Sequence, residues 1–434
     1  MNVDTLISAR WVIPVEPENT VLEDHSVVIQ DGKIIAILPT HKAKTKYTPT
    51  QMHDLAQHAL IPGLINTHTH AAMSLFRGMA DDLPLMEWLT EHIWPAEKKW
   101  VSAAFVEDGT RLAVAEMIRS GTTCFSDMYF FPDCVAEVAS DAGIRAVIGL
   151  IVIDFPSAWA KDPDEYLLKA GQVHHKYRNT PLITTAFAPH SPYAVSDTSL
   201  LQLNTLAEEM DIPIHMHVHE TKEEVSESME KIGKRPLQRL HELGLLSPRL
   251  LAVHMTQLES AEIDLIARYG VNVIHCPESN LKLASGFCPV HTLQEAGVNV
   301  ALGTDGAASN NDLDMIGEMH TASLLGKGVA ENSLAVKAFT AMKMATINAA
   351  KALGLDDKIG SLRKGKQADI TAIDLGELES QPLYDPISQI IYTANRNQVS
   401  DVWVAGKQLL QSRELLSLNE NQIKLSTVKW KEKF

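Results

Sequence analysis

Short runs of hydrophobic residues alternate with amphipathic stretches through the middle of the chain. Apolar residues between the runs recur at helical spacing, as in the stretch that follows Ser196. Near-continuous apolar strands that alternate with helices are typical of a parallel sheet covered by helices. Eight such units predict an α/β fold with a closed (β/α)8 barrel. The eight runs are residues 59–70, 122–128, 145–154, 182–190, 212–220, 250–255, 271–279 and 298–306.

Glycines mark the predicted ends of several helices. Gly121, Gly143, Gly270 and Gly297 each stand just before a predicted strand, where helices commonly stop. An open, doubly wound sheet is the alternative arrangement of the same elements. No G-x-G-x-x-G sequence follows an early strand, so the dinucleotide-binding version of that alternative is disfavoured.

Both ends of the chain have a different pattern. The first end contains "HSVVIQDGKIIAI", whose central turn predicts a β-hairpin, and the last contains the strand-like "ADITAIDL" and "SDVWVAGKQLL". A helical segment, residues 333–353, leads from the middle to the C-terminal strands. We therefore expect a barrel at residues 59–357 and a small β domain built from residues 1–58 and 358–434.

Charge and composition narrow the class of ligand. The chain has 434 residues, is 45% hydrophobic and carries a formal net charge of −16. A surface this acidic repels nucleic acid, whereas small neutral or cationic molecules are easier to accept. No run of about 18 apolar residues or signal-peptide pattern occurs, so we expect a cytoplasmic protein without a membrane partner. The four cysteines lack C-x-x-C spacing and do not suggest a disulfide framework.

Polar side chains collect where the predicted strands end, which in a barrel is the catalytic face. Five of the eight strands end in side chains that can bind metal or transfer protons. Histidines buried in the core for packing could account for any one of these strand ends, but not for five together. His68 and His70, two apart on the first strand, point to one side. With a histidine of the fifth strand and Asp305 of the eighth, they would leave an open position on a divalent metal for water. The strand-end residues are His68, His70, His190, His217, His254 and Asp305.

The fifth strand carries "HMHVHE", residues 215–220, with three histidines at alternating positions. In a regular strand all three lie on one face, so pleating alone makes them equivalent. A single metal rarely takes three neighbouring ligands from one strand, and Glu220 needs a separate explanation.

Several motifs together resemble the amidohydrolase superfamily, and within it the 5′-methylthioadenosine/S-adenosylhomocysteine deaminases of the cytosine-deaminase-like branch. They are "PGLINTHTH", "HVHET", "VHMTQL", "LGTDGAASNND" and "IGSLRKGKQADITAID", and the resemblance runs from about residue 5 to residue 410. It implies a (β/α)8 barrel with a β-sandwich made from both chain ends. It also implies one divalent metal, usually zinc and in some relatives iron.

The resemblance assigns a role to each matching residue. Its metal ligands fall on His68, His70, His217 and Asp305, and its H-x-x-E motif falls on His217 and Glu220. Its catalytic residues fall on Glu220, His254 and Asp305. Its substrate contacts fall on Trp88, Glu97, His190, Glu220 and Asp305. His215 would then lie one layer deeper in the barrel, and His219 receives no role.

The implied reaction is hydrolytic deamination of an adenine nucleoside to its inosine analogue and ammonia. Water activated at the metal attacks C6, Glu220 carries a proton to N1, Asp305 accepts a proton, and His254 stabilises developing charge. Binuclear relatives need a lysine on the fourth strand, and residues 182–190 contain none, so we expect one metal. Without the resemblance, Trp88 would be read as a packing residue and Glu97 as a solvated acid.

Other functions remain open from the sequence. The main alternative is another hydrolase of the superfamily, such as a guanine, 8-oxoguanine or cytosine deaminase or a triazine chlorohydrolase. A non-catalytic relative should have lost ligands, and all are present. Residues 154–169 contain Lys161 and Lys169 but no arginine to hold a carboxylate, so we expect methylthioadenosine or adenosine to be preferred over S-adenosylhomocysteine. The sequence is also compatible with a homo-oligomer. Residues 310–312 either line the pocket or cap the next helix.

Overall fold

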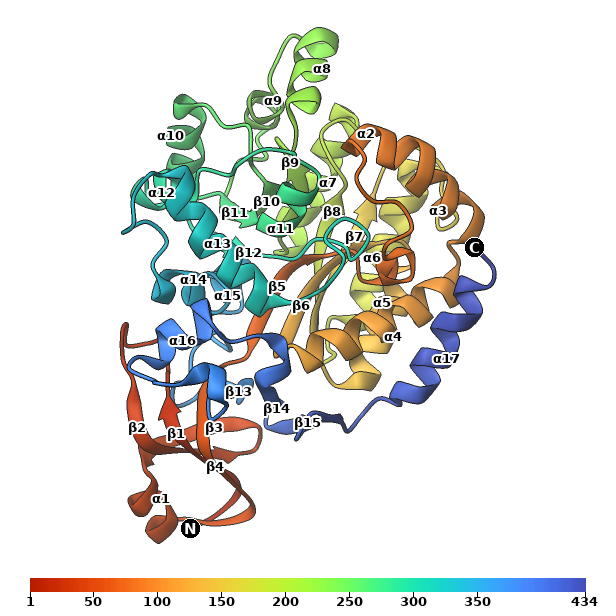
Figure 1. Ribbon diagram of the computed structural model, residues 1–434. Coiled ribbons are helices and arrows are strands. Elements are labelled where there is room, and N and C mark those ends of the chain that lie inside the picture. The colour runs from red at the N-terminus through yellow and green to blue at the C-terminus, as the bar shows by residue number, and fades with distance from the viewer.

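The computed structural model describes residues 1–434 and confirms the predicted barrel (Figure 1). Eight parallel strands lie side by side in chain order, from β5 to β12. Each predicted run contributes one of them. Their bounds are β5 Leu64–Thr69, β6 Thr122–Tyr129, β7 Arg145–Val152, β8 Ile183–Pro189, β9 Ile214–Val218, β10 Leu250–His254, β11 Asn272–His275 and β12 Val300–Leu302.

Helices surround the barrel, and the predicted glycines end helices as expected. Gly121, Gly143, Gly270 and Gly297 all have positive φ, between 67° and 91°, which glycine adopts without steric cost. The helices are α4 Ala103–Arg119, α5 Pro132–Ala142, α6 Pro163–Tyr177, α7 Asp197–Met210, α8 Lys222–Ile232, α9 Pro236–Glu242, α10 Ser260–Tyr269, α11 Pro277–Lys282, α12 Val290–Glu295, α13 Met315–Val329, α14 Ala338–Met344 and α15 Ile347–Ala352.

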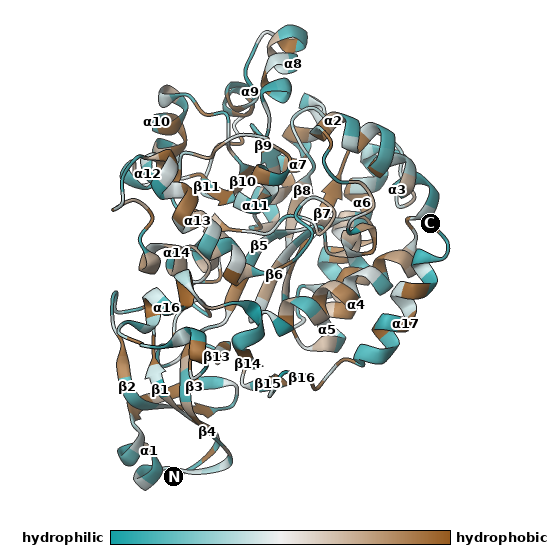
Figure 2. Ribbon diagram, viewed as in Figure 1, coloured by the Kyte–Doolittle hydropathy of each residue, from teal (hydrophilic) through white to brown (hydrophobic).

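A further helical segment follows β5 and lies over the catalytic face of the barrel (Figure 1). It contains η1 Ala71–Phe76, α2 Leu85–Glu87, η2 Trp88–Ile93 and α3 Trp94–Trp100. None of the helices combines the length and the apolar composition that a bilayer crossing requires. The barrel strands are mostly hydrophobic, whereas the outer turns of the helices are hydrophilic (Figure 2).

The two chain ends form one eight-stranded sheet, in the order β16-β15-β14-β13-β4-β1-β2-β3. Strand β4 joins the ends because it pairs parallel with β1 and antiparallel with β13. The sheet folds back on itself, since Lys33 at the start of β3 bridges Gln367 before β13. The bounds are β1 Asn2–Val12, β2 Leu22–Gln30, β3 Lys33–Pro39, β4 Thr48–Pro62, β13 Ile370–Asp374, β14 Val399–Val404, β15 Lys407–Gln411 and β16 Glu414–Leu415.

Two predicted elements are divided in the structure. The run 59–70 holds the end of β4 and the whole of β5, separated at Gly63, where an added Cβ would collide with Thr123. The predicted helical segment 333–353 is two short helices, α14 and α15, because Thr346 between them leaves the helical conformation. The first division lets one hydrophobic run serve both sheets.

The remaining helices belong to the two chain ends, and one of them lies against the barrel. They are α1 Thr40–Lys46, η3 Leu378–Ser380, α16 Pro386–Tyr392, η4 Arg396–Gln398 and α17 Glu420–Lys431. In α17, Trp430 donates from Nε1 to Asp108 of α4 at 2.8 Å. The division into residues 59–357 and the two ends stays a prediction, but α17 packs on the barrel rather than in the sheet of the ends.

A buried ion pair joins the barrel to that sheet. Arg145, the first residue of β7, donates from Nε and Nη2 to the two carboxylate oxygens of Asp369 at 2.9 and 3.1 Å. The Asp369 side chain also accepts the backbone N–H of Ala405 at 2.7 Å. The two side chains are 6% and 2% exposed, so little solvent screens the pair.

Replacing Arg145 by Ala leaves the Asp369 carboxylate buried without its cation. We expect the free energy of unfolding to fall by about 3–5 kcal/mol, measured by urea denaturation. The control is Lys44→Ala, which removes an exposed pair with Asp54 and should change stability little. Equal losses in the two variants would contradict the role of the buried pair.

Candidate metal and catalytic centre

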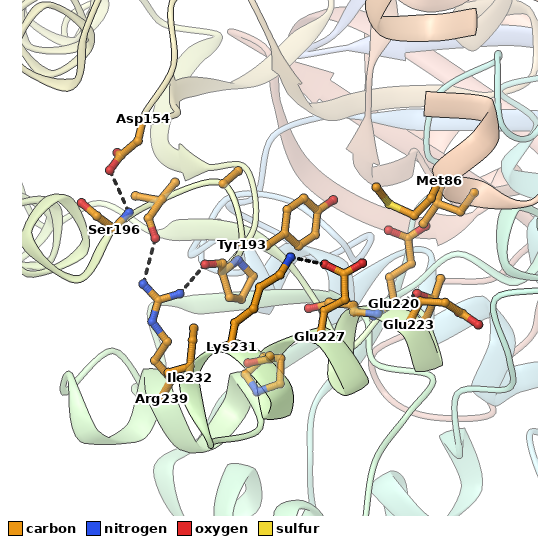
Figure 3. A pocket seen from close by; sticks show the side chains of 18 of the residues that line it. Met86, Asp154, Tyr193, Ser196, Glu220, Glu223, Glu227, Lys231, Ile232 and Arg239 are labelled. Carbon is orange, nitrogen blue, oxygen red and sulfur yellow. Dashed lines mark hydrogen bonds and ion pairs between the residues drawn. The ribbon is translucent and has the colours of Figure 1, made fainter. Parts of the chain in front are cut away.

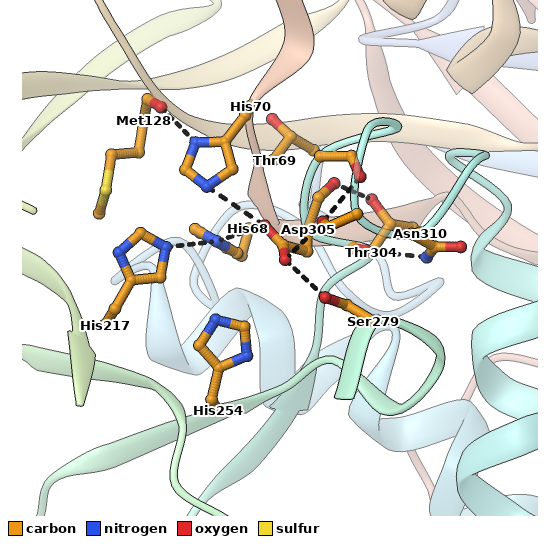
Figure 4. A network of polar contacts seen from close by, with 12 residues as sticks. His68, Thr69, His70, Met128, His217, His254, Ser279, Thr304, Asp305 and Asn310 are labelled. Carbon is orange, nitrogen blue, oxygen red and sulfur yellow. Dashed lines mark hydrogen bonds and ion pairs between the residues drawn. The ribbon is translucent and has the colours of Figure 1, made fainter. Parts of the chain in front are cut away.

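Four strand-end side chains converge at the carboxyl end of the barrel (Figure 4). His68 and His70 come from β5 and its end, His217 from β9, and Asp305 from the loop after β12. One ligand atom of each residue lies within 4.8 Å of the others. Asp305 Oδ1 is 3.2 Å from both His68 Nε2 and His70 Nε2, and His217 Nε2 is 3.1 Å from His68 Nε2.

When these histidines are neutral, their hydrogen bonds leave unprotonated nitrogens facing one another. His70 Nδ1 donates to the carbonyl oxygen of Met128 at 2.6 Å, and His217 Nδ1 donates to that of His190 at 2.7 Å. In a neutral imidazole the other nitrogen, Nε2, then carries a lone pair. Lone pairs turned toward one centre repel unless a cation lies between them. Three nitrogens and a carboxylate oxygen fit a zinc ion with a position left for water.

The three histidines of "HMHVHE" have different environments in the structure. His217 faces the centre, whereas His215 lies deeper, with Nε2 2.9 Å from His68 Nδ1. His219 has φ of +54°, so the strand pleat ends before it and its ring turns away. Its Nδ1 lies 3.2 Å from the Gln257 carbonyl oxygen, and its Nε2 accepts the Leu237 N–H at 3.2 Å. His215 therefore supports the ring of His68, and the hydrogen bonds of His219 hold its ring away from the centre.

Electrostatics favour an anionic Asp305 among mainly neutral imidazoles. Burial lowers the pKa of His68 to about 4 and that of His217 well below its ordinary value. Burial also lowers the pKa of His70, but the hydrogen bond and charge of Asp305 outweigh it and raise that pKa to about 9. Burial alone would raise the pKa of Asp305, yet the adjacent His68 and His70 hold it well below its ordinary value. Asp305 therefore attracts positive charge, which without a metal is the proton on His70 and which a bound cation would replace.

Two serines that the sequence did not single out fix the orientation of Asp305. Ser279 Oγ and Ser309 Oγ donate to Asp305 Oδ2 at 2.7 and 2.8 Å, which leaves Oδ1 facing the histidines. Asn310 braces the same loop by donating to the Thr304 carbonyl oxygen at 2.8 Å. The serines lie in "HCPES" and "GTDGAASNND", next to strand ends. This position is the only feature of the sequence that could have identified them.

Glu220 and His254 lie beside the metal-binding group. Glu220 is 8% exposed, accepts no hydrogen bond on its carboxylate, and has one oxygen 3.8 Å from His254 Nε2. Burial raises the pKa of Glu220. His254 Nδ1 donates to the side-chain oxygen of Asn280 at 2.9 Å, so its Nε2 side faces Glu220 and the centre. A buried acid without a partner is placed to exchange protons with a ligand.

The centre opens into a cavity of about 280 Å³, and the predicted substrate contacts all line it. Trp88 is buried and donates from Nε1 to the Ala80 carbonyl oxygen at 3.1 Å. Glu97 accepts the Tyr129 hydroxyl at 2.7 Å, and burial of its carboxyl raises its pKa to about 7. Burial lowers the pKa of His190 to about 3, so its ring is neutral. Glu97 is therefore not a solvated acid.

The amidohydrolase family matches residues 59–409. The chain belongs to the amidohydrolase family. A relative from Saccharophagus degradans, 5-methylthioadenosine/S-adenosylhomocysteine deaminase, is 54% identical over 99% of this chain and 96% of its own. The crystal structure of an adenosine deaminase from Xanthomonas campestris with bound zinc is 52% identical, has a TM-score of 0.99, and covers 100% of this chain and 98% of that chain.

A more distant solved structure shares the fold. Atrazine chlorohydrolase TrzN from Arthrobacter aurescens, solved with zinc, is 22% identical, with a TM-score of 0.91 over 98% of this chain and 99% of its own. Together with the histidine and aspartate cluster, the family match identifies a metal-dependent hydrolase.

Separate substitutions of His215, His217 and His219 test which of these histidines binds the metal. His217→Asn removes a ligand and should abolish metal retention, whereas His215→Phe removes the support of His68 and should weaken metal affinity about 10–100-fold. His219→Gln should lower the melting temperature and keep full metal content. Metal content by plasma mass spectrometry and affinity by chelator competition test this series. Full metal retention in His217→Asn would refute the ligand assignment.

Proposed function

We propose that the chain is a metal-dependent deaminase that hydrolyses adenine nucleosides to their inosine analogues and ammonia. The substrate class comprises 5′-methylthioadenosine, adenosine and S-adenosylhomocysteine. The observation that carries the proposal is the buried, unpaired Glu220, three residues beyond His217 and facing the same cavity. The names of the relatives from S. degradans and X. campestris support the same reaction.

His68, His70, His217 and Asp305 would hold one zinc ion, or iron in its place. When bound, such an ion lowers the pKa of a water ligand to about 7, which supplies a nucleophile at neutral pH. Ser279 and Ser309 keep Asp305 Oδ2 turned away from the histidines, so Oδ1 is the oxygen available for binding. We propose a single ion because a second ion would need a carboxylated lysine on β8, and β8 contains no lysine.

Glu220 would carry the protons of the reaction. As water adds to C6 of the adenine ring, Glu220 donates a proton to N1, and its raised pKa makes the protonated form more available at neutral pH. Asp305 accepts the proton that the water loses. His254 presents Nε2 toward the developing negative charge, with its ring held by Asn280. The proton on Asp305 then passes to the exocyclic amine, which leaves as ammonia, and the hydroxyl proton returns to Glu220 as the C6 carbonyl forms.

The remaining cavity residues would position the nucleoside. The Trp88 indole N–H is already used by Ala80, so the ring would contact the substrate through its apolar surface. Glu97 accepts hydrogen bonds and would bind the ribose hydroxyls, and His190 would contact the ribose or the purine. We also propose a cytoplasmic location and no nucleic-acid partner, and homo-oligomerisation stays open.

Replacing Glu220 by Gln should separate chemistry from metal binding. We expect kcat to fall about 10²–10⁴-fold, because the amide cannot carry the proton, while metal content stays at the wild-type level. Glu230→Gln makes the same charge change on the exposed side of α8 and should leave kcat unchanged. Near-wild-type turnover in Glu220→Gln would rule out the proton shuttle.

A substrate panel tests the reaction class itself. We expect ammonia release, and the ultraviolet shift from adenine to hypoxanthine, with methylthioadenosine and adenosine. Guanine and cytosine should give no turnover above background. Failure on every adenine nucleoside would end the proposal, and turnover of guanine or cytosine alone would favour another deaminase of the family.

A further inference from the structure

A second cavity adjoins the catalytic one, and we call it the annex. It has a volume of about 420 Å³ and is bounded by the loops after β7 and β8 and by helix α8 (Figure 3). The two cavities share Leu85, Phe155, Tyr193, Ala194 and Glu220. A substituent that leaves the catalytic cavity on this side therefore enters the annex.

The walls of the annex are largely apolar and partly aromatic. Phe155 and Tyr193 are each 48% exposed, and Met86 and Ile232 are also exposed at its rim. In the view of Figure 3, Glu220 lies between Tyr193 and Met86. Exposed apolar side chains gathered around a cavity mark a binding surface. Aromatic faces and a methionine suit a thioether chain, and the faces also attract a cation.

The cationic groups of the annex are already paired. Lys231 Nζ lies 2.6 Å from a carboxylate oxygen of Glu227. Arg239 Nε lies 2.6 Å from a carboxylate oxygen of Asp197, and its other nitrogens donate to the carbonyl oxygens of Pro192 and Val195. A ligand carboxylate would have to displace one of these partners.

Two exposed acids of the annex, Asp154 and Glu223, have no cationic partner. Asp154 accepts the Ser196 backbone N–H at 3.0 Å, and the side chains of both Asp154 and Glu223 are exposed. Glu224 contributes less charge, because burial raises its pKa to about 8 and its carboxyl accepts backbone N–H groups. With Glu227 neutralised by Lys231, the annex keeps a net negative charge from Asp154 and Glu223.

The loop beyond β7 adds no free cation. Lys169 Nζ lies 2.9 Å from a carboxylate oxygen of Glu165 and also donates to the Trp159 carbonyl oxygen. Lys161 is exposed, lies 3.6 Å from Asp162, and does not line the annex. Neither lysine is placed to hold a carboxylate inside the cavity.

We infer that the annex binds the 5′ substituent of the nucleoside and selects its charge. It accepts thioethers that are neutral or end in an ammonium group and disfavours those that carry a carboxylate. The preferred extended substrates are 5′-alkylthio adenine nucleosides with a terminal amine and no acid. This inference rests on the proposed function, because it places the adenine ring at Glu220.

Three 5′-deoxyadenosine derivatives of matched length test the inference. They carry a 5′-(3-aminopropylthio), a 5′-butylthio or a 5′-(2-carboxyethylthio) group and differ at the end in charge. We expect kcat/KM for the amine to exceed that for the acid at least about tenfold, with the butyl compound between them. The ratio should shrink when ionic strength rises from about 0.05 M to about 0.5 M, because the acids are solvent-accessible.

Substitutions in the annex locate the effect. Asp154→Asn and Glu223→Gln should each lower the ratio of the amine to the acid, and the double variant should lower it most. Glu230→Gln removes one charge from the same helix outside the annex and should leave the ratio at its wild-type value.

The outcomes separate this inference from the proposed function. Equal kcat/KM values for amine and acid, or a preference for the acid, overturn the inference while methylthioadenosine turnover keeps the function. The same holds if Glu230→Gln changes the ratio as much as Glu223→Gln does. Absence of turnover on methylthioadenosine as well as on all three derivatives overturns the function and the inference with it.

Discussion

The closure of the barrel between its first and last strands is the constraint on which the site depends. Asn66 and Thr304 exchange hydrogen bonds at 2.8 and 3.0 Å, and the Asp305 N–H donates to the His68 carbonyl oxygen at 3.0 Å. An added Cβ on Gly303 would lie 2.7 Å from the His68 nitrogen, so only glycine permits this approach. Residues more than 230 positions apart meet here, and the ligand group exists only in the closed barrel.

The strand ends that carry the chemistry also carry backbone strain. His219, His254 and Asp305 have φ values of +54°, +74° and +65°, a region that costs a non-glycine residue about 1–3 kcal/mol. At these residues the regular strand conformation ends, so the side chains can turn toward the cavity or away from it. In β9 the turn at His219 removes that ring from the catalytic face, and the chain then presents Glu220 to it. The surrounding hydrogen bonds hold the strained positions in place.

Much of this arrangement could be predicted from the sequence because its signals are local. Apolar runs identified the strands, glycines the helix ends, and strand-end histidines the face of the barrel that holds the metal-binding group. The division at Gly63 was not visible, since residues on both sides of it are equally apolar. Ser279 and Asn280 could not be assigned either, because a serine or an asparagine after a strand has many uses and only the folded chain shows its partner. The docking of Trp430 on α4 likewise depends on contacts far apart in the chain.

The two cavities differ in how their charges act. Around the metal-binding group, burial removes water, so each hydrogen bond and each charge changes proton affinity strongly. In the annex, Asp154 and Glu223 remain open to solvent, so their field is weakened and acts over short distances. Solvent-exposed charges such as these are too weak to drive a difficult chemical step, but they suffice to distinguish ligands that differ by a whole charge. The fold thus keeps the groups proposed to exchange protons in its dry interior, while the charges facing the annex lie where a ligand's substituent would reach solvent.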